Sequence, residues 1–226
     1  MTFSELPTAK SVLAVCAHPD DESFGLGAIL GAFHDQGAQL SVLCFTRGEA
    51  STLHDREADL AVVRTAEFAR AADVLGVSRS ELLDYPDGHL AEQAFGGLVA
   101  HVIQLIQETA TDLLLVFDEG GISGHSDHVQ ATKAATAAGT ALQIPVLAWA
   151  ISDEVAIALN QEFGAGFLGC SDDQLDFRVV IDRVRQHQAI ACHRSQSVGN
   201  PVLARRLQLS GGVEQLRWLT SVVDMP

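Results

Sequence analysis

The stretch from Ser11 to Glu22 has the sequence Ser-Val-Leu-Ala-Val-Cys-Ala-His-Pro-Asp-Asp-Glu and is the most informative part of the 226-residue chain. Its first seven residues form a short apolar run that stops just before a proline, which indicates a buried strand. One imidazole and three carboxylates then follow within His18 to Glu22. Crowding such groups at the end of a buried strand is costly unless a cation or a reaction uses them. The stretch therefore predicts a strand that delivers a polar site.

Strand-like and helix-like segments alternate outward from this stretch. We expect strands over residues 11–17, 39–46, 81–85, 112–117, 145–151 and 177–181, and helices over residues 21–36, 56–75, 95–108, 128–142, 182–193 and 213–223. This order predicts an α/β fold with a mostly parallel sheet and helices on both faces. Residues 1–226 show no repeat and no low-complexity linker, so a single domain is expected, with glycine-rich residues 164–173 as a candidate mobile loop.

Composition narrows the class of protein and its partners. Apolar residues make up 47% of the chain, which suits a filled core, and the formal net charge is −15. An acidic surface without a Lys/Arg cluster disfavours nucleic acid and anionic membranes. The chain starts without a signal-peptide pattern and has no apolar run of transmembrane length. Its four cysteines form no C-x-x-C pair, and Cys16 and Cys44 lie in expected strands as small buried hydrophobes. A cytoplasmic protein is the simplest interpretation.

The residues able to do chemistry follow the ends of the expected strands. His18 to Glu22 follow the first strand, Arg47 to Glu49 the second, Asp87 the third, and Asp118 to His128 the strand over residues 112–117. In open parallel sheets, ligands bind at the carboxyl ends of the strands. We therefore expect these residues to converge at one edge of the sheet.

A second polar cluster, Gly124-His125-Ser126-Asp127-His128, lies in a glycine-rich turn that opens a helix. Combined with the first cluster it yields a three-ligand set, His18, Asp21 and His128. Two nitrogens and one oxygen from protein, with an open position for water, are typical of catalytic zinc. A set of two histidines and one aspartate also accepts Fe²⁺, Mn²⁺ and other divalent ions.

The neighbours of this set suggest the chemistry. Zn²⁺ lowers the pKa of bound water toward about 7. Asp20 is placed to act as the base for that water. A protonated His125 can stabilise the oxyanion and protonate a leaving amine, with Asp127 nearby to orient or charge it. The sequence thus predicts metal-assisted hydrolysis of an amide or ester.

Simpler interpretations exist for each cluster. Asp20, Asp21 and Glu22 could serve only as favourable charges in a first helical turn. His125 and His128 could be helix-start residues without a metal. The glycines at positions 25, 27 and 31 superficially resemble a dinucleotide fingerprint, but their spacing is wrong and close helix–sheet packing explains them better.

Three motifs in this order resemble the LmbE-like (PIG-L) N-acetylglucosaminyl deacetylases, which include the de-N-acetylases of glycosylphosphatidylinositol, mycothiol and bacillithiol biosynthesis. The motifs are A-H-P-D-D-E at residues 17–22, T-R-G-E at 46–49 and G-H-x-D-H at 124–128, within a resemblance that covers about residues 11–197. It implies a zinc-dependent deacetylase with a Rossmann-like, three-layer fold. It also implies the roles already given to His18, Asp21 and His128 as ligands, Asp20 as base and His125 as stabiliser.

The resemblance also implies two substrate-binding residues, each with a simpler alternative. Arg64 lies in the apolar stripe of the helix over residues 56–75, where an arginine is costly unless it is paired or faces a cavity. The family has a sugar-binding arginine in this context; the alternative is a side chain that snorkels to solvent. Asp87, in Tyr-Pro-Asp-Gly, matches a family aspartate that binds sugar hydroxyls; the alternative is an ordinary turn former. A His-x-Ser-Gln stretch at residues 193–196 is expected to line or brace the pocket.

The leading hypothesis is a zinc-dependent hydrolase that removes an acetyl group from an amino sugar or related small molecule. The protein could also be a homo-oligomer. The first alternative is a metal-binding or sugar-binding protein without catalysis, and the second is a nucleotide-binding Rossmann protein. The chain departs from the family pattern at Ala50, Ser51 and Thr52, which follow the T-R-G-E motif, and at Arg183 and Arg185, where a lysine is usual. These departures leave the identity of the substrate open.

Overall fold

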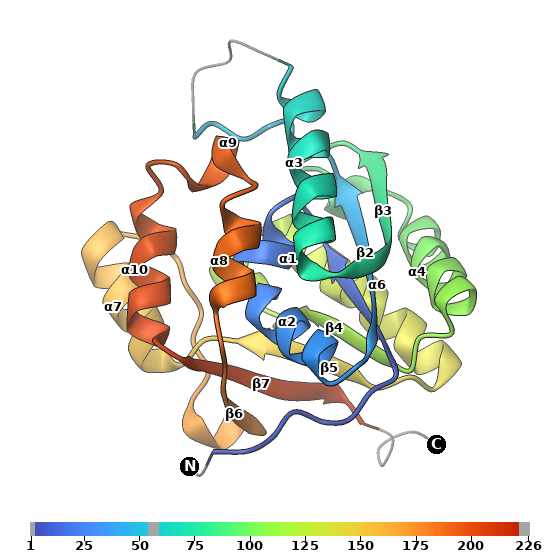
Figure 1. Cartoon of the computed structure of the whole chain (residues 1–226). Coiled ribbons are helices and arrows are strands. Elements are labelled where there is room, and N and C mark those ends of the chain that lie inside the picture. The colour runs from blue at the N-terminus through green and yellow to red at the C-terminus, as the bar shows by residue number, and fades with distance from the viewer. Residues whose placement is uncertain (1–2, 54–58, 222–226) are drawn as a thin grey trace.

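A computed structural model describes residues 3–53 and 59–221, which form a seven-stranded sheet (Figure 1). The strand order is β3-β2-β1-β4-β5-β7-β6. Strands β1 to β5 pair in parallel, and β7 lies antiparallel between β5 and β6. The strands are β1 (Ser11–Cys16), β2 (Gln39–Thr46), β3 (Val77–Tyr85), β4 (Leu113–Phe117), β5 (Val146–Ala150), β6 (Phe177–Val180) and β7 (Val213–Thr220). The expectation of a mostly parallel sheet is confirmed.

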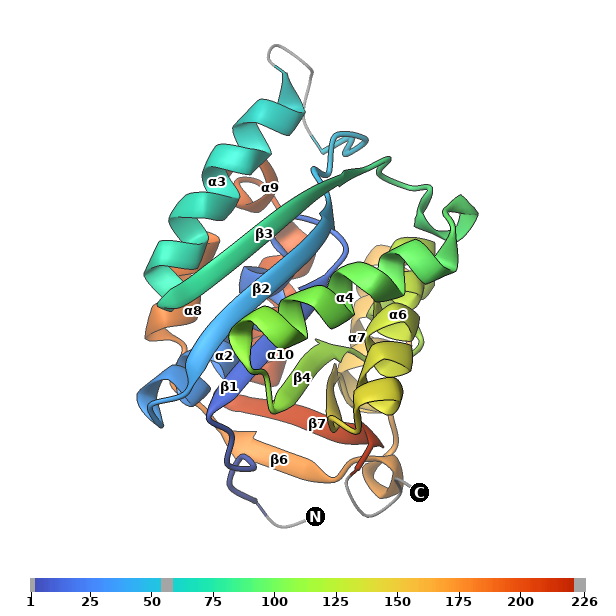
Figure 2. The same cartoon turned by 90° about the vertical axis from the view of Figure 1, so that its right-hand side faces the viewer.

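Helices cover both faces of this sheet and complete a three-layer architecture (Figure 2). One face carries α4 (Phe95–Thr109) and α6 (Ser126–Leu142), and the other carries α1 (Asp21–Phe24), α2 (Gly27–Asp35), α3 (Leu60–Leu75) and α8 (Val184–Ile190). Helices α7 (Asp153–Phe163) and α10 (Pro201–Ser210) pack on each other. The short elements are η1 (Leu90–Glu92), α5 (Gly121–Gly124), η2 (Asp172–Gln174) and α9 (Arg194–Ser197).

Strand β1 shows why the opening run is apolar throughout. Val12 and Ala14 point to the face covered by α2 and α3, whereas Leu13 and Val15 point to the face covered by α4 and α6. All four side chains are buried. A central parallel strand is covered on both faces, so both sets of alternating side chains must be apolar.

The helix expected over residues 213–223 is wrong. Residues 213–220 form strand β7, and residues 222–223 lie outside the part that the structure describes. Alternate residues Glu214 and Leu216 are buried, which is the period of a strand. Glu214 meets Trp149 of β5, whose indole Nε1 donates to its carboxylate at 2.7 Å. Pairing with β5 and β6, which lie elsewhere in the sequence, thus makes this segment a strand.

Other boundaries differ in smaller ways. The helix expected over residues 21–36 is broken at Gly25 and Leu26. A Cβ on Gly25 would lie 2.4 Å from the Phe117 ring, so this position requires glycine. Close packing, expected for these glycines, is thereby confirmed at Gly25. Residues 56–58 of another expected helix lie outside the described residues; α3 begins after Asp59, whose side chain accepts from the Ala61 and Val62 N–H groups. Helices α7 and α10 were not expected.

The fold brings the polar loops together. The carboxyl ends of β1 to β5 share one edge of the sheet, and the strand order reverses direction between β1 and β4. Such a switch point is where open α/β sheets bind ligands. His18 follows β1 and His128 follows β4, so they flank this point from two neighbouring strands.

Candidate active site

The turn after β1 is held by its own side chains. Asp21 opens α1, and its Oδ2 atom accepts the backbone N–H groups of Ala17 and His18 at 3.0 and 2.9 Å. The other oxygen, Oδ1, lies 3.1 Å from His128 Nε2. Asp21 therefore fixes the turn with one oxygen and presents the other to α6.

His18, Asp21 and His128 converge as the sequence predicts. His18 Nδ1 lies 3.1 Å from His128 Nε2 and 3.8 Å from Asp21 Oδ2. Both histidine rings and the carboxylate are largely withdrawn from solvent. These three residues could hold a metal ion.

The partners of the two rings support a cation between them. His128 Nδ1 lies 3.1 Å from the carbonyl of Gly121, so it donates there and leaves Nε2 as a lone pair. His18 Nε2 lies 3.0 Å from Asp87 Oδ1 and 3.4 Å from Asp127 Oδ2, so it carries a proton and leaves Nδ1 as a lone pair. The two lone pairs then face each other across a carboxylate oxygen. A divalent ion satisfies that arrangement, and the carboxylates behind His18 are the partners that orient metal-binding imidazoles.

The pKa values reflect the same contacts. Burial by itself lowers the pKa of His18, but the carboxylates of Asp127 and Asp87 raise it to about 10. A metal ion at Nδ1 would therefore have to displace the second ring proton of His18. Burial by itself raises the pKa of Asp21, yet the charge and hydrogen bond of His128, together with His18, hold it well below its usual range. The Asp21 carboxylate is thus ionised throughout the neutral pH range, as a metal ligand has to be.

Asp20 adopts a backbone conformation that side chains rarely take, with φ of 125°. Its carboxylate lies 3.0 Å from Arg64 Nη2 and remains slightly exposed, with 15% of the side chain accessible. Burial raises the pKa of Asp20 to about 6 against the opposing charge of Arg64. A carboxylate with that pKa is ionised at pH 7 and still basic enough to accept a proton.

Arg64 is buried and paired, so the snorkelling alternative is wrong. Its Nη1 donates to Gly48 O at 2.7 Å and its Nη2 donates to Pro19 O and pairs with Asp20. Gly48 has φ of 66°, and a Cβ there would lie 2.2 Å from Arg64 Nη1. The guanidinium thus joins the T-R-G-E loop to the Asp20 turn. Arg64 also lines the cavity. Its expected contact with the substrate remains a prediction.

Glu22, the acidic residue of the opening motif that sequence reasoning left without a role, is fully buried. Its Oε2 accepts the backbone N–H of Asp20 at 2.9 Å, and its Oε1 lies 2.6 Å from His193 Nε2. Burial by itself lowers the pKa of His193, but the negative charge of Glu22 raises it. The net effect is a pKa above the usual value for histidine. Glu22 and His193 therefore brace the backbone of Asp20 from behind.

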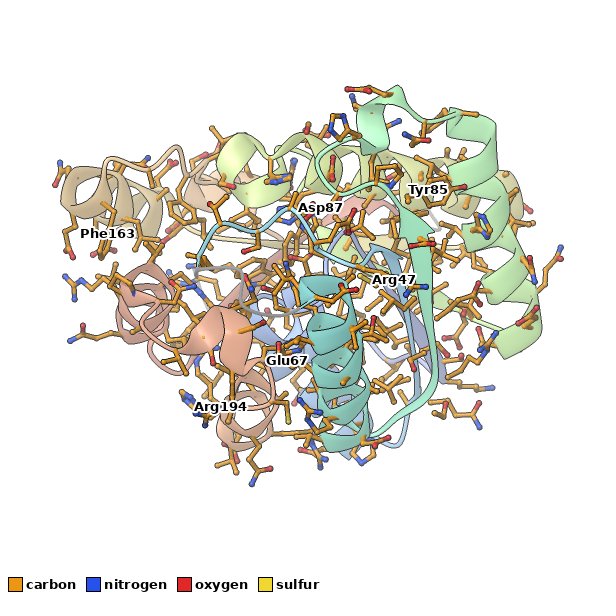
Figure 3. All side chains as sticks on the ribbon, turned by 90° about the horizontal axis from the view of Figure 1, so that it is seen from above. Arg47, Glu67, Tyr85, Asp87, Phe163 and Arg194 are labelled. Carbon is orange, nitrogen blue, oxygen red and sulfur yellow. The ribbon has the colours of Figure 1, made fainter. Side chains whose placement is uncertain are left out.

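The His-x-Ser-Gln stretch braces the pocket at two further points, as expected. Ser195 donates through both its backbone N–H and its hydroxyl to Glu67 of α3, at 2.9 and 2.6 Å. Gln196 accepts from the Ser51 hydroxyl at 2.7 Å and lines the cavity. Figure 3 shows Glu67 on α3 facing the α9 segment. Glu67 lies three residues after Arg64 on the same helix face, a signal that could have identified it.

Asp87, labelled in the upper middle of Figure 3, lies where the loops after β2 and β3 meet. Its backbone N–H donates to Glu49 at 2.9 Å, and its carboxylate accepts the Ala50 N–H at 2.9 Å. The same carboxylate flanks His18 Nε2. Asp87 is therefore more than a turn former: its carboxylate lies beside His18, a candidate metal ligand, and it lines the cavity. Its expected contact with sugar hydroxyls remains a prediction.

Asp127 and His125 meet through the backbone. The Asp127 N–H donates to His125 Nδ1 at 3.2 Å, while the Asp127 carboxylate accepts the N–H groups of Gly88 and Leu90 at 2.7 and 3.1 Å. Partial burial and the charges of His18 and His128 lower the pKa of His125. His125 Nδ1 accepts the Asp127 N–H, so the proton of the neutral ring lies on Nε2. Protonation of His125 during catalysis stays a prediction.

These residues open into a cavity of about 620 Å³. His18, Asp20, Asp21, His125 and His128 lie on its wall together with Arg64 and Asp87. Six larger apolar or cationic side chains that sequence reasoning did not assign to a site also line it: Phe24, Phe117, Trp149, Phe167, Leu203 and Arg206. They come from residues spread over the whole chain and carry no local motif.

Comparisons with known proteins agree with these motifs. A family model described as GlcNAc-PI de-N-acetylase, PIG-L, matches residues 13–139. A 1D-myo-inositol 2-acetamido-2-deoxy-alpha-D-glucopyranoside deacetylase of Mycolicibacterium vanbaalenii is 31% identical over 184 residues, 68% of this chain and 63% of that protein. One from Catenulispora acidiphila is 32% identical over 168 residues, 63% of this chain and 52% of that protein. The chain thus spans about half the length of several curated relatives that it matches.

More distant proteins share the fold. An N-acetylglucosaminyl-phosphatidylinositol de-N-acetylase of Bos taurus is 26% identical over 81% of this chain and 74% of its own. The N,N'-diacetylchitobiose deacetylase of Pyrococcus horikoshii has a TM-score of 0.69 at 20% identity, over 93% of this chain and 84% of its own. The 4-carboxy-2-hydroxymuconate hydratase GalB of Pseudomonas putida KT2440 has a TM-score of 0.71 at 18% identity, over 94% and 97%. A deacetylase and a hydratase share this architecture, so the fold alone leaves the reaction open.

Proposed function

Because the chain belongs to the PIG-L family of GlcNAc-PI de-N-acetylases, we propose that it hydrolyses the acetamide of an N-acetylated amino sugar or related small molecule with a bound zinc ion. The observation that carries the proposal is the convergence of His18 Nδ1, His128 Nε2 and Asp21 beside the raised-pKa carboxylate of Asp20. Relatives named as deacetylases of acetamido sugars support the substrate class.

His18, Asp21 and His128 would hold the metal ion. A zinc ion there would polarise the amide carbonyl and make a coordinated water more acidic. Asp20 accepts a proton from the water as its oxygen bonds to the carbonyl carbon. His125, with its proton on Nε2, donates a hydrogen bond to the developing oxyanion. The C–N bond then breaks, and the amine leaves with the proton that Asp20 accepted from the water.

The other residues hold this machinery in place. Arg64 and Glu22 fix Asp20 from two directions, and Asp87 and Asp127 orient His18. Arg64 and Asp87 also face the cavity, where we propose that they bind the sugar portion. No helix in residues 3–53 and 59–221 is long and apolar enough to cross a membrane.

The test measures amine release from N-acetylated sugars together with metal content. We expect His128→Ala to lose both the metal and turnover, because it removes one of three ligands. Asp20→Asn keeps the metal, since Asp20 is not a ligand, and lowers kcat by roughly 100- to 10,000-fold. Chelation followed by addition of Zn²⁺, Fe²⁺ or Mn²⁺ identifies the metal that restores activity.

Asp84→Asn is the matched control, because Asp84 is an exposed carboxylate paired with Arg47 outside the cavity. It should change neither metal content nor turnover. Normal turnover of Asp20→Asn would remove the base assignment. A metal-loaded wild-type protein without hydrolysis on any N-acetylated sugar would favour the non-catalytic alternative.

A further inference from the structure

One cation on the wall of the cavity is not used by the proposed reaction. Arg206, on α10, lines the cavity, although only 5% of the residue is exposed. Asn200 and Leu203 precede it at intervals of three residues and also line the cavity, so this face of α10 forms part of the wall. A buried arginine is costly unless a carboxylate or another anion matches its charge.

The carboxylate that pairs with Arg206 already has two other partners. Glu214 Oε1 accepts a hydrogen bond from Arg183 Nη1, and Glu214 Oε2 accepts one from Trp149 Nε1 at 2.7 Å. Arg206 Nη1 lies 3.6 Å from Glu214 Oε1, which is too far for a hydrogen bond. Two guanidinium groups thus share one carboxylate, and the cluster of Arg183, Arg206 and Glu214 keeps one positive charge in excess.

The hydrogen bonds of Arg206 are also incomplete. Its Nη2 donates to the carbonyl of Phe24, whereas its buried Nη1 has no hydrogen-bond partner within the described part of the chain. Arg183, in contrast, donates to two backbone carbonyls besides Glu214. Burial lowers the pKa of Arg206 to about 10, so its guanidinium remains charged at neutral pH.

The acidic side chains of the cavity do not supply the missing partner of Arg206. Three carboxylates line the cavity in residues 3–53 and 59–221, and each faces another basic group: Asp20 faces Arg64, Asp21 faces His128, and Asp87 faces His18. An anion that matches Arg206 therefore has to come from a bound molecule.

Arg206 lies close to the three-ligand set. Its acceptor Phe24 ends α1, the four-residue helix that begins at Asp21, so these two residues are separated by about 5 Å along the helix axis. The guanidinium also covers the Trp149 ring at 5.2 Å, and Trp149 packs against Phe117 on the cavity wall. A small molecule whose amide lies at the three-ligand set can therefore extend to Arg206.

Resting on the function proposed above, we propose that Arg206 binds an anionic group of the substrate, a carboxylate or a phosphate, and that the protein acts on an N-acylated amino sugar that carries such a group. The anion matches the positive charge that the fold leaves in excess. Hydrogen bonds between a guanidinium and these anions are strong, because both partners are charged. Arg206 is thus a specificity-determining residue, and it lies outside the three motifs.

The first experiment compares amine release from matched anionic and neutral substrates by the metal-loaded protein. N-acetylglucosamine is compared with its 6-phosphate and with N-acetylmuramic acid, which place a phosphate or a carboxylate on the sugar. N-butanoylglucosamine is compared with N-succinylglucosamine, which has the same number of acyl carbons and adds a carboxylate. We expect at least one anionic compound to exceed its neutral partner about tenfold in kcat/KM, chiefly through KM.

The compound that responds identifies the anion and the part of the substrate that reaches Arg206. If every neutral compound is hydrolysed at least as well as its anionic partners, the anion proposal is overturned and the proposed deacetylation stands. Absence of hydrolysis for all five compounds overturns both proposals.

Variants of neighbouring arginines test the residue assignment. Arg206→Met removes the charge and should lower the anionic-to-neutral ratio of kcat/KM about tenfold, whereas Arg206→Lys keeps the charge and should retain part of the preference. Arg205→Met is the matched control, because Arg205 is a partly exposed residue of α10 that pairs with Glu162 at 2.7 Å. It should leave the ratio unchanged. An unchanged ratio in Arg206→Met would overturn the role of Arg206.

Thermal unfolding distinguishes this role from a structural one. Arg206→Met leaves Glu214 paired with Arg183 and Trp149, so its Tm should stay within about 3 °C of the wild-type value. Arg183→Met removes a hydrogen-bonded partner of the buried Glu214 carboxylate and should lower the Tm by roughly 10 °C. Equal losses in the two variants would show that Arg206 is a matched core charge and would overturn the proposal.

Discussion

At the scale of single residues, the strained backbone lies at the residue that we propose as the base. Asp20 has φ of 125°, a conformation that costs about 1–3 kcal/mol for a residue with a side chain. Glu22 holds its N–H, and Arg64 holds its carboxylate and the preceding carbonyl of Pro19. Such restraints aim one carboxylate oxygen in a fixed direction before substrate arrives.

The Glu22–His193 pair gives a prediction at this scale. His193→Ala removes the partner of a buried carboxylate and should destabilise the protein by about 3 kcal/mol. For a chain of this size that corresponds to a fall in Tm of roughly 10 °C. Thermal unfolding followed by circular dichroism measures it. His187→Ala, an exposed position on the same segment, is the control and should shift stability by less than about 0.5 kcal/mol. Equal Tm values for the two variants would contradict the bracing role.

At the scale of elements, loops matter more than helices for the site. The loop after β2 reaches Arg64 through Gly48, and Asp87 through Glu49 and Ala50. The loop after β3 reaches α6 through the two N–H groups held by Asp127. Strands β1, β2, β3 and β4 therefore deliver one cross-linked set of loops.

A matched pair of glycines tests this cross-linking. Gly48 and Gly37 both have positive φ, of 66° and 88°, so alanine at either costs about 1 kcal/mol in backbone strain. Only at Gly48 does the added Cβ meet another group, the guanidinium of Arg64, whereas nothing lies within 4 Å at Gly37. We expect Gly48→Ala to lower kcat at least tenfold with the metal retained.

Gly37→Ala should leave kcat unchanged, because Gly37 precedes β2 at the opposite edge of the sheet. Steady-state kinetics and metal analysis of the two purified proteins decide the outcome. If Gly48→Ala retains normal kcat, the guanidinium does not need its observed position for turnover.

At the scale of the whole molecule, the motif-bearing residues do not form the complete sheet. The motifs end near residue 197, yet β7 lies between β5 and β6 and is contributed by residues 213–220. Glu214 of β7 also joins Arg183 and Trp149 in a buried polar cluster. The site and the C-terminal strand are thus parts of one core.

Truncation tests this dependence. A chain ending at residue 197 loses α10 and β7, so β5 and β6 lose their shared partner and Trp149 loses the Glu214 carboxylate. We expect this protein to lack a cooperative unfolding transition, because exposed strand edges and an unpaired polar cluster remain. Calorimetry beside the full chain measures it. A cooperative transition at the full-chain Tm would show that residues 11–197 fold alone.

The sequence by itself determined the parallel core and identified the three residues that converge as a candidate metal site. Local patterns were enough for both predictions. Apolar runs indicate the buried strands, and the segments after these strands contain His18, Asp20, Asp21, Asp87 and His128. Pocket-bracing by residues 193–196 followed from motif resemblance. Only the tertiary structure decided the fate of residues 213–220, the pairing of Glu22 with His193 and of Arg64 with Asp20, and the position of Arg206 on the cavity wall. Each of these depends on contacts between residues far apart in sequence, and the free energy of such contacts leaves no periodic or local signature in the chain.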